Sequence, residues 1–289
     1  MVKMYKASNI FFIVGPSHPE KNNFPYVKKT EVLIWDDKNK RSINKIFIKK
    51  EILNLEIAFD NLFVVCESSI FVFNIKNFQL IDVIKTGPNR KGLIAVSYEQ
   101  NNILVYPSDG EENGQLTIKN YDLKYYTYLK CHKSEIAFYT LSNDGLFLAT
   151  ASAEWEYIRI YEAKTGEYLD EIFREKENDN KIKCININME NDFISASCKQ
   201  GFIHIWTLNE SRKKLKKKIT NNDIKNNKNK LSNKKKAFKQ IELDKGTTYE
   251  IYKFGENNIL YIITSIGEYF KVQFDLKSKE VSKIKNQLF

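Results

Sequence analysis

Histidine and cysteine side chains are the groups in this chain that could bind a metal or act as nucleophiles. The sequence contains three histidines and four cysteines, which are His18, His132, His204, Cys66, Cys131, Cys184 and Cys198. No two cysteines form a C-x-x-C pair, and the histidines are too scattered for a zinc site. Cys131 and His132 are neighbours that point to opposite faces of a strand, which rules out a nucleophile–base pair. The chain also lacks a G-x-S-x-G motif and a phosphate-binding loop. We therefore expect buried reduced thiols, no metal, no cofactor and no enzymatic activity.

The positive charge of the chain is concentrated in one segment. Residues Asn209–Lys239 contain 13 of the 46 Lys and Arg residues but only 2 of the 36 Asp and Glu residues. This basic segment therefore carries the whole excess behind the net charge of +10. It is rich in Asn and poor in apolar residues, so we expect a mobile, disordered loop. Such a loop can contact nucleic acid or an anionic membrane, or it can be solvated without a function.

Short β-rich runs, bounded by Asn, Asp, Gly or Ser, make up most of the remaining sequence. Comparable first strands begin near Ile52, Leu93, Ile136 and Ile182, about 40–45 residues apart, which is the period of a four-stranded propeller blade. The next first strand begins near Tyr249, late by roughly the length of the basic segment. We infer that this segment is an insert within a blade and does not link two domains.

The period predicts an all-β fold, a single β-propeller formed by residues 1–289. Six four-stranded units are readable, namely Val2–Ile48, Ile52–Ile84, Leu93–Lys130, Ile136–Phe173, Ile182–Leu243 and Tyr249–Ile284. Blades of this kind stack radially, and we expect them to close on themselves with the two chain ends near each other. The alternative is an open pair of β-sandwiches. No apolar run reaches the ~18–20 residues of a membrane-spanning helix, so we expect a soluble, cytoplasmic protein.

Several short motifs follow one another in a specific order. They include Val32–Asp37, Thr86–Leu93, Asn143–Ser152, Tyr157–Tyr161 and Gly201–Trp206. Their order and spacing resemble the PROPPIN family, seven-bladed WD-repeat-like propellers that bind phosphoinositides in autophagy and endosomal traffic. Members of the family begin with a further blade, so the resemblance implies either a truncated chain or a propeller that closes with six blades.

The resemblance also implies a lipid site. The family carries Phe-Arg-Arg-Gly at the end of its fifth blade, where this chain has Ile172–Glu175. Without gaps, only the second arginine is retained, as Arg174, and a shift by one residue would retain the first instead. The second of the family's two pockets would then use Arg174, Ser197 and His204, with Lys199 adding a positive charge. The plainer alternative is that His204 is an ordinary strand histidine.

The first pocket of the family would use His132, Thr150 and Ser152. Here the resemblance implies a weakened site, because Glu156 replaces a threonine of the family and Glu154 is nearby. Carboxylates repel a phosphate, and no arginine compensates in the ungapped register.

One weak lipid site does not hold a protein on a membrane, and stable attachment needs a second signal. The basic segment lies where the family has its membrane-inserting loop. Its contact residues would be Lys213, Lys214, Leu215, Lys216, Lys217, Lys218 and Ile219. A short helix would place Leu215 and Ile219 on one face. That face is thin, so we expect electrostatic adsorption, and deletion of Ser211–Lys236 should leave the fold intact.

Three function classes follow. The favoured one is an adaptor that binds a phosphoinositide, phosphatidylinositol 3-phosphate, and acts as a monomer on endosomal, autophagic or vacuolar-type membranes. Its protein partner would come from the autophagy lipid-transfer or conjugation machinery. The second class is a propeller scaffold that has lost lipid binding. The third is nucleic-acid binding, which is disfavoured because Asn209–Ala237 contains no aromatic residue for base stacking.

Overall fold

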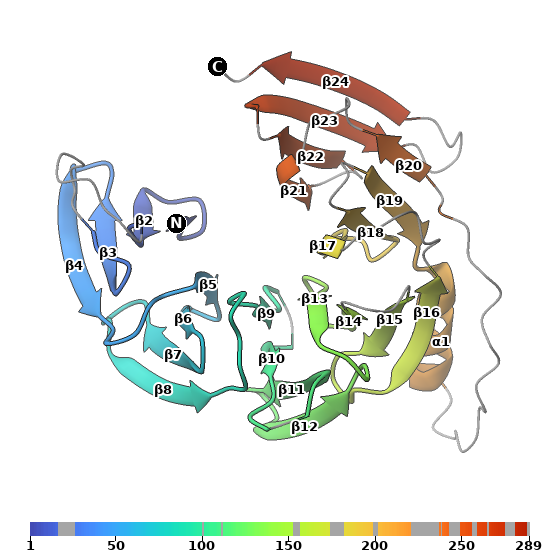
Figure 1. Ribbon diagram of the computed structural model, residues 1–289, viewed down its shortest axis with the longest axis horizontal. Helices are drawn as coiled ribbons and strands as arrows, with labels where there is room; N and C mark the ends of the chain where they lie inside the picture. The colour runs from blue at the N-terminus through green and yellow to red at the C-terminus, as the bar shows by residue number, and fades with distance from the viewer. Residues whose placement is uncertain are drawn as a thin grey trace. The chain divides into compact units, whose positions relative to one another are not determined.

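The structure is a computed structural model that describes most of the chain. The described residues are 1–16, 27–99, 101–110, 112–152, 157–173, 182–198, 202–220, 237, 239–242, 249–255, 259–264, 266–274 and 281–287. They form six four-stranded antiparallel sheets and one α-helix (Figure 1). We call the sheets blades 1 to 6 in chain order.

The first three blades precede residue 131. Blade 1 contains β1 (Val2–Met4), β2 (Ile10–Ile13), β3 (Glu31–Asp36) and β4 (Arg41–Phe47). Blade 2 contains β5 (Asn54–Ala58), β6 (Asn61–Cys66), β7 (Ser69–Asn74) and β8 (Leu80–Lys85). Blade 3 contains β9 (Ala95–Val96), β10 (Ile103–Pro107), β11 (Gln115–Asn120) and β12 (Tyr125–Lys130).

The last three blades include the helix. Blade 4 contains β13 (Ile136–Leu141), β14 (Phe147–Ser152), β15 (Tyr157–Glu162) and β16 (Tyr168–Phe173). Blade 5 contains β17 (Ile182–Ile187), β18 (Phe193–Cys198), β19 (Phe202–Thr207) and β20 (Lys239–Glu242), with α1 (Asn209–Thr220) between β19 and β20. Blade 6 contains β21 (Tyr249–Phe254), β22 (Ile259–Thr264), β23 (Glu268–Phe274) and β24 (Val281–Gln287).

Each sheet pairs its four strands in chain order, so every blade is a meander of hairpins. The six units expected from the sequence period are therefore confirmed, with the basic segment inside blade 5. The strands form where β-branched and aromatic residues gather between turns, as in the run Ser69–Asn74. Closure of the blades into a ring stays a prediction.

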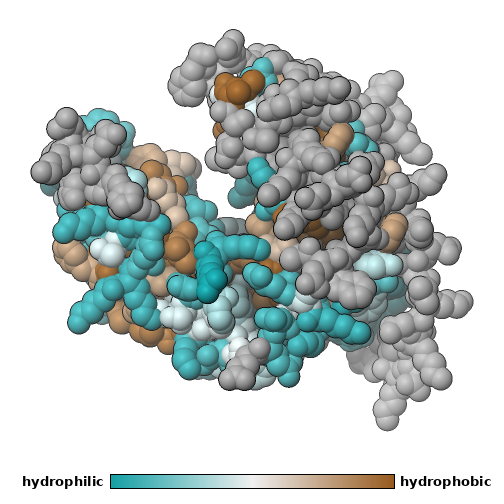
Figure 2. Space-filling view, in the orientation of Figure 1, coloured by the Kyte–Doolittle hydropathy of each residue, from teal (hydrophilic) through white to brown (hydrophobic). Residues whose placement is uncertain are grey.

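The chain divides into two compact units, and the first comprises Met1–Tyr98 and Leu104–Glu112. Its core lies between blades 1 and 2. Phe12 and Ile34 from blade 1 and Leu55 and Val64 from blade 2 are all fully buried there. Apolar side chains also reach the surface of this unit, along the margin where Figure 1 draws β4 and β8 (Figure 2). The exposed apolar residues on these two strands are Ile43, Phe47, Leu80, Ile81 and Val83.

The second unit comprises Glu99–Ile103 and Asn113–Phe289 and holds two cores. One joins blades 4 and 5 through residues such as Ile160, Ile172 and Trp206. The other joins blades 5 and 6 through residues such as Ile203 and Leu260. Because successive side chains of a strand point to opposite faces, blade 5 contributes one face to each core.

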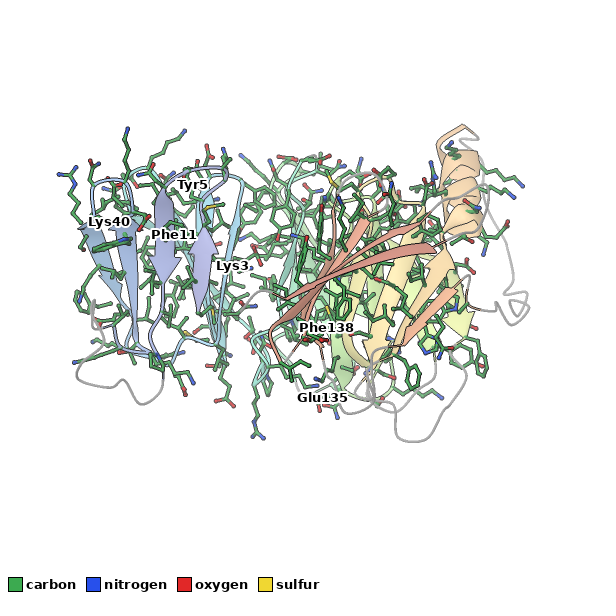
Figure 3. The ribbon with its side chains drawn as sticks, turned by 90° about the horizontal axis from the view of Figure 1, so that it is seen from above. Lys3, Tyr5, Phe11, Lys40, Glu135 and Phe138 are labelled. Atoms are coloured by element: carbon green, nitrogen blue, oxygen red, sulfur yellow. The ribbon has the colours of Figure 1, made fainter. Side chains whose placement is uncertain are left out.

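Helix α1 differs from the mobile loop that we expected over 209–239. The helix lies beside β16 of blade 4 (Figure 1). Figure 3 draws the helix in pale orange. Leu215 is only 4% exposed and belongs to the core between blades 4 and 5. The hydroxyl of Ser211 donates to Asp170 Oδ2 at 3.2 Å. An apolar anchor and acidic partners on blade 4 thus order a sequence that its composition alone would leave unfolded. Residues 221–236 of the predicted loop lie outside the described residues.

No helix in the described part of the chain is long and apolar enough to cross a membrane.

Candidate functional site

The residues predicted for the second pocket are not all brought together. Across the β18–β19 hairpin, Ser197 pairs with Ile203 and Ala196 pairs with His204. Directly paired residues share a face and successive residues alternate, so Ser197 and His204 lie on opposite faces of blade 5. Ser197 is fully buried, and its hydroxyl donates to the carbonyl of Cys184 at 3.4 Å. Ser197 therefore serves the interior of the blade and does not share a pocket with His204.

His204 lies on the face of blade 5 that packs against blade 4. Its strand neighbour Trp206 and its cross-strand neighbour Ala196 both belong to the core that these blades share. The imidazole of His204 is half-buried and stacks on the indole of Trp206, with ring centroids 5.7 Å apart and planes 20° apart. Arg174, which follows the last residue of β16, and Lys199 lie outside the described residues.

The first-pocket residues do come together. His132 Nε2 lies 2.9 Å from Thr150 Oγ1, and His132 and Thr150 are both buried. Ser152 follows Thr150 by two positions on β14, so it shares the same face. Lys130 ends β12, so Cys131 and His132 lie in the loop that follows and not on a strand as we expected.

Arg159 belongs to the same cluster and was missed by the sequence reasoning. It pairs across the sheet with Thr150, so its side chain shares that face of blade 4. Its guanidinium donates to the main-chain carbonyl of Cys131, and its Nε lies 3.8 Å from a carboxylate oxygen of Glu171. The sequence pattern could have pointed to Arg159, because it lies between the core residues Ile158 and Ile160. A charged residue between two core residues of a strand must point to the opposite face.

The electrostatics of this cluster indicate a structural role. Burial, followed by the charge of Arg159, lowers the pKa of His132 to about 4, so its imidazole is neutral at pH 7. Burial raises the pKa of the Cys131 thiol to about 12. The Tyr161 hydroxyl also donates to the Cys131 carbonyl, at 3.2 Å. A neutral, buried imidazole with a protein partner offers little to a phosphate. Glu154 and Glu156, on which the expected weakening of the first pocket rests, lie outside the described residues, so the weak pocket stays a prediction.

The lysines of α1 divide into two sets. Lys214 and Lys218 face blade 4, where Lys214 Nζ lies 3.8 Å from Asp170 Oδ1 and Lys218 binds Glu162 and Glu167. Burial lowers the pKa of Lys218, but its hydrogen bonds to these two glutamates outweigh burial, and the pKa is raised. Lys218 therefore stays charged and holds the helix to blade 4.

Lys213, Lys216 and Lys217 are exposed. At 100° per residue they project from the side of α1 opposite to Ser211 and Leu215. Leu215, which we expected to contact a membrane, is buried against blade 4 instead, because its face of the helix covers β16. The side chain of Ile219 lies outside the described part of the chain. Glu210 is also exposed on this side, and its carboxylate lies 3.0 Å from Lys213 Nζ. The outward face of α1 therefore carries three lysines and one glutamate among its described side chains, an excess of positive charge.

Among the described residues, no group of three or more His, Cys, Asp or Glu side chains could hold a metal ion.

The succession of six four-stranded meanders defines a β-propeller, and solved structures share this fold. Hsv2 from Kluyveromyces lactis superposes with a TM-score of 0.73 at 16% identity, covering 99% of this chain and 84% of that chain. KlAtg21, solved in complex with the coiled coil of AgAtg16, gives a TM-score of 0.78 at 18% identity and covers 100% of this chain and 85% of that chain.

The family model for PROPPIN matches residues 5–221, and the chain belongs to the PROPPIN family. Autophagy-related protein 18e of Arabidopsis thaliana is 28% identical over 95% of this chain and 72% of its own length. Autophagy-related protein 18 of Komagataella pastoris is 25% identical over 73% of this chain. The mouse WD repeat domain phosphoinositide-interacting protein 2 is 27% identical over 74% of this chain. The chain covers only 44% and 46% of the lengths of these last two relatives.

Proposed function

We propose that this protein is a membrane-recruited adaptor that binds a phosphoinositide, phosphatidylinositol 3-phosphate, in autophagy and endosomal membrane traffic. The names of its relatives support an autophagy role, and one of them is a phosphoinositide-interacting protein. The observation that carries the proposal is the basic outward face of α1. This helix begins directly after the hairpin strand that carries His204 and is fastened to blade 4.

Attachment would use two signals. The first is a headgroup site that includes His204 and, by the family pattern, Arg174 and Lys199, whose side chains can donate to phosphate oxygens. The second is the set of three outward lysines on α1. Each cation near an anionic leaflet contributes about 1 kcal/mol, and Glu210 offsets part of the charge of Lys213, so the set would contribute about 2–3 kcal/mol. Neither signal is sufficient alone, which makes recruitment depend on the headgroup and on the carrier lipid together.

A scaffold without lipid binding is the second candidate. It is favoured by the internal hydrogen bonds of His132 and Ser197, which occupy polar groups that a phosphate would need. The KlAtg21 complex with a coiled coil is an example of a propeller of this fold that binds a protein partner.

Flotation with liposomes that each carry one mono- or bisphosphorylated inositide separates the two candidates. The intact chain should float with phosphatidylinositol 3-phosphate. His204→Phe keeps an aromatic ring beside Trp206 but removes the imidazole nitrogens, and it should weaken flotation about tenfold. Lys183→Ala, an exposed position on the same blade, is the matched control and should float like the intact chain. If the intact chain floats with none of these inositides, the adaptor is refuted and the scaffold is supported. If His204→Phe floats as well as the intact chain, His204 is not part of the lipid site.

A further inference from the structure

The outer strand of blade 3, β12, has an open edge. It ends the strand order β12-β11-β10-β9 and pairs on one side with β11, while no other described strand pairs with its outer side. Blade 4 differs, because α1 lies against its outer strand β16 and Lys214 binds the main-chain carbonyl of Leu169 there. An open edge presents a row of main-chain N–H and C=O groups that another strand can pair with.

The two faces of β12 have different surroundings. Tyr125 and Thr127 point toward blade 4. The Tyr125 hydroxyl donates to the carbonyl of Lys164, and Thr127 Cγ2 lies 3.1 Å from the position that a Cβ would take on Gly166. The contacts of this face hold β12 against blade 4. Tyr126 and Tyr128 occupy the other face and are 52% and 70% exposed. Successive residues on one face of a strand are ~7 Å apart, so the two rings form a stripe along the open edge.

Basic groups accompany this stripe. Lys119 lies opposite Tyr126 on β11, and its Nζ is 4.7 Å from the ring centroid of Tyr121 and 5.3 Å from that of Tyr126. Lys124 and Lys130 are exposed at the two ends of the strand. Asp122 is the one acidic residue between positions 119 and 130, and its carboxylate binds Asn102. The edge therefore combines exposed aromatic rings with an excess of positive charge.

We propose that β12 is a docking strand for an acidic peptide in extended conformation, which adds to blade 3 as a fifth strand. Main-chain pairing would provide part of the affinity, and alternate side chains of the peptide would reach the tyrosine stripe. Tyrosine is enriched among residues that dominate binding energies. The two-residue spacing of Tyr126 and Tyr128 matches the repeat of a strand rather than the three- and four-residue spacing of a helix. This surface lies on a different blade from the lipid site, so the inference goes beyond the proposed function.

Fluorescence anisotropy with a labelled peptide tests the proposal. The probe is an eight-residue peptide in which Glu alternates with Val, and the comparison peptide carries Lys in place of Glu. The acidic peptide should bind the intact protein and the basic peptide should not. The double variant Tyr126→Ser/Tyr128→Ser should bind the acidic peptide at least about tenfold more weakly. Ile81→Ser, which removes an apolar side chain that is 53% exposed on β8, is the matched control and should bind normally.

Amide hydrogen exchange distinguishes strand addition from contact through side chains. The peptide should slow exchange at alternate amides of Tyr125–Lys130, because only every second residue directs its N–H to the open edge. Absence of binding by the acidic peptide, equal binding of both peptides, or binding that leaves these amides unprotected would overturn the proposal. Preferential binding of an acidic amphipathic helix would overturn it as well.

Discussion

Replacing Leu215 by alanine should release α1 from blade 4. The leucine is 4% exposed and is the one residue of the helix that belongs to the core between blades 4 and 5 among the described residues. Burial of a leucine side chain contributes about 1.5–3 kcal/mol, and truncation also leaves a cavity. The remaining contacts are polar ones at the edge of the blade, such as the Ser211–Asp170 hydrogen bond. Such contacts contribute about 1 kcal/mol each.

The loss should therefore be about 2–3 kcal/mol of docking free energy. Amide hydrogen exchange of α1, measured by mass spectrometry, should accelerate by about 30- to 160-fold, because helix amides exchange through local undocking. Amides of the blade 1 strands should not change. Lys216→Ala, on the exposed side of the same helix, should leave exchange nearly unaltered and controls for helix propensity.

Equal exchange rates of α1 in Leu215→Ala and Lys216→Ala would refute the anchored helix. The same docking changes an earlier expectation. Deletion of Ser211–Lys236 removes Leu215 and uncovers its neighbours in blade 4, so this deletion should now lower the stability of the second unit.

Three further predictions concern buried groups. The pKa of His132 in the folded protein, about 4, lies below its ordinary value, so the unfolded chain binds the proton more tightly. The free energy of unfolding should therefore be at its full value above pH 6.5 and lower by about 2 kcal/mol at pH 5. In urea unfolding, the free energy of His132→Phe should depend less on pH than that of the intact chain. Gly114 has φ +74°, and an added Cβ would overlap the main-chain carbonyl oxygen of His132. Gly114→Ala should therefore lower the free energy of unfolding in urea by about 1–3 kcal/mol. The loss should exceed that of Gly166→Ala, where the nearest neighbour of the added Cβ is the movable side chain of Thr127, and an equal loss would contradict this reasoning. Cys66 and Cys131 are buried, and burial raises the pKa of both thiols. Iodoacetamide at pH 8 should therefore label them only after unfolding. Rapid labelling of the native protein would contradict this prediction.

The fold was predictable because its information is local. Most strands are short runs of β-forming residues that end at turn residues, and the spacing of these runs identifies the blades. The run Ile70–Ile75, for example, matches β7 (Ser69–Asn74) to within one residue at each end. The helix was not predictable in this way. Asp170 and Glu162, which bind its lysines, lie 44 and 56 positions before Lys214 and Lys218, so its order depends on tertiary contacts.

The lipid site shows the limit of spacing arguments. The family pattern places Ser197 and His204 at suitable distances along the chain, yet the register of their hairpin puts them on opposite faces. Face assignment depends on the conformation of the turn between the strands, and a shift of one residue would exchange the faces. The sequence predicted His132, Thr150 and Ser152 of the cluster around His132. It did not predict Arg159, Tyr161 or Glu171, and the contacts of Arg159 and Tyr161 with the Cys131 carbonyl depend on the fold of the loop after β12.

One liposome experiment tests the two-signal account most directly. The intact chain and the variant Lys213→Glu/Lys216→Glu/Lys217→Glu are floated with phosphatidylinositol 3-phosphate in neutral and in anionic carrier lipid, at low and at physiological salt. A variant with Lys38, Lys49 and Lys133 each replaced by Glu, all exposed positions on other segments, provides an equal change of charge.

The account predicts that the intact chain and the variant at Lys38, Lys49 and Lys133 float strongly only when the liposomes contain both the phosphoinositide and the anionic carrier lipid. Their flotation should weaken at physiological salt, because salt screens surface charge. The α1 variant should lose the gain from the anionic carrier. Equal flotation of all three proteins in anionic carrier at low salt would contradict the account.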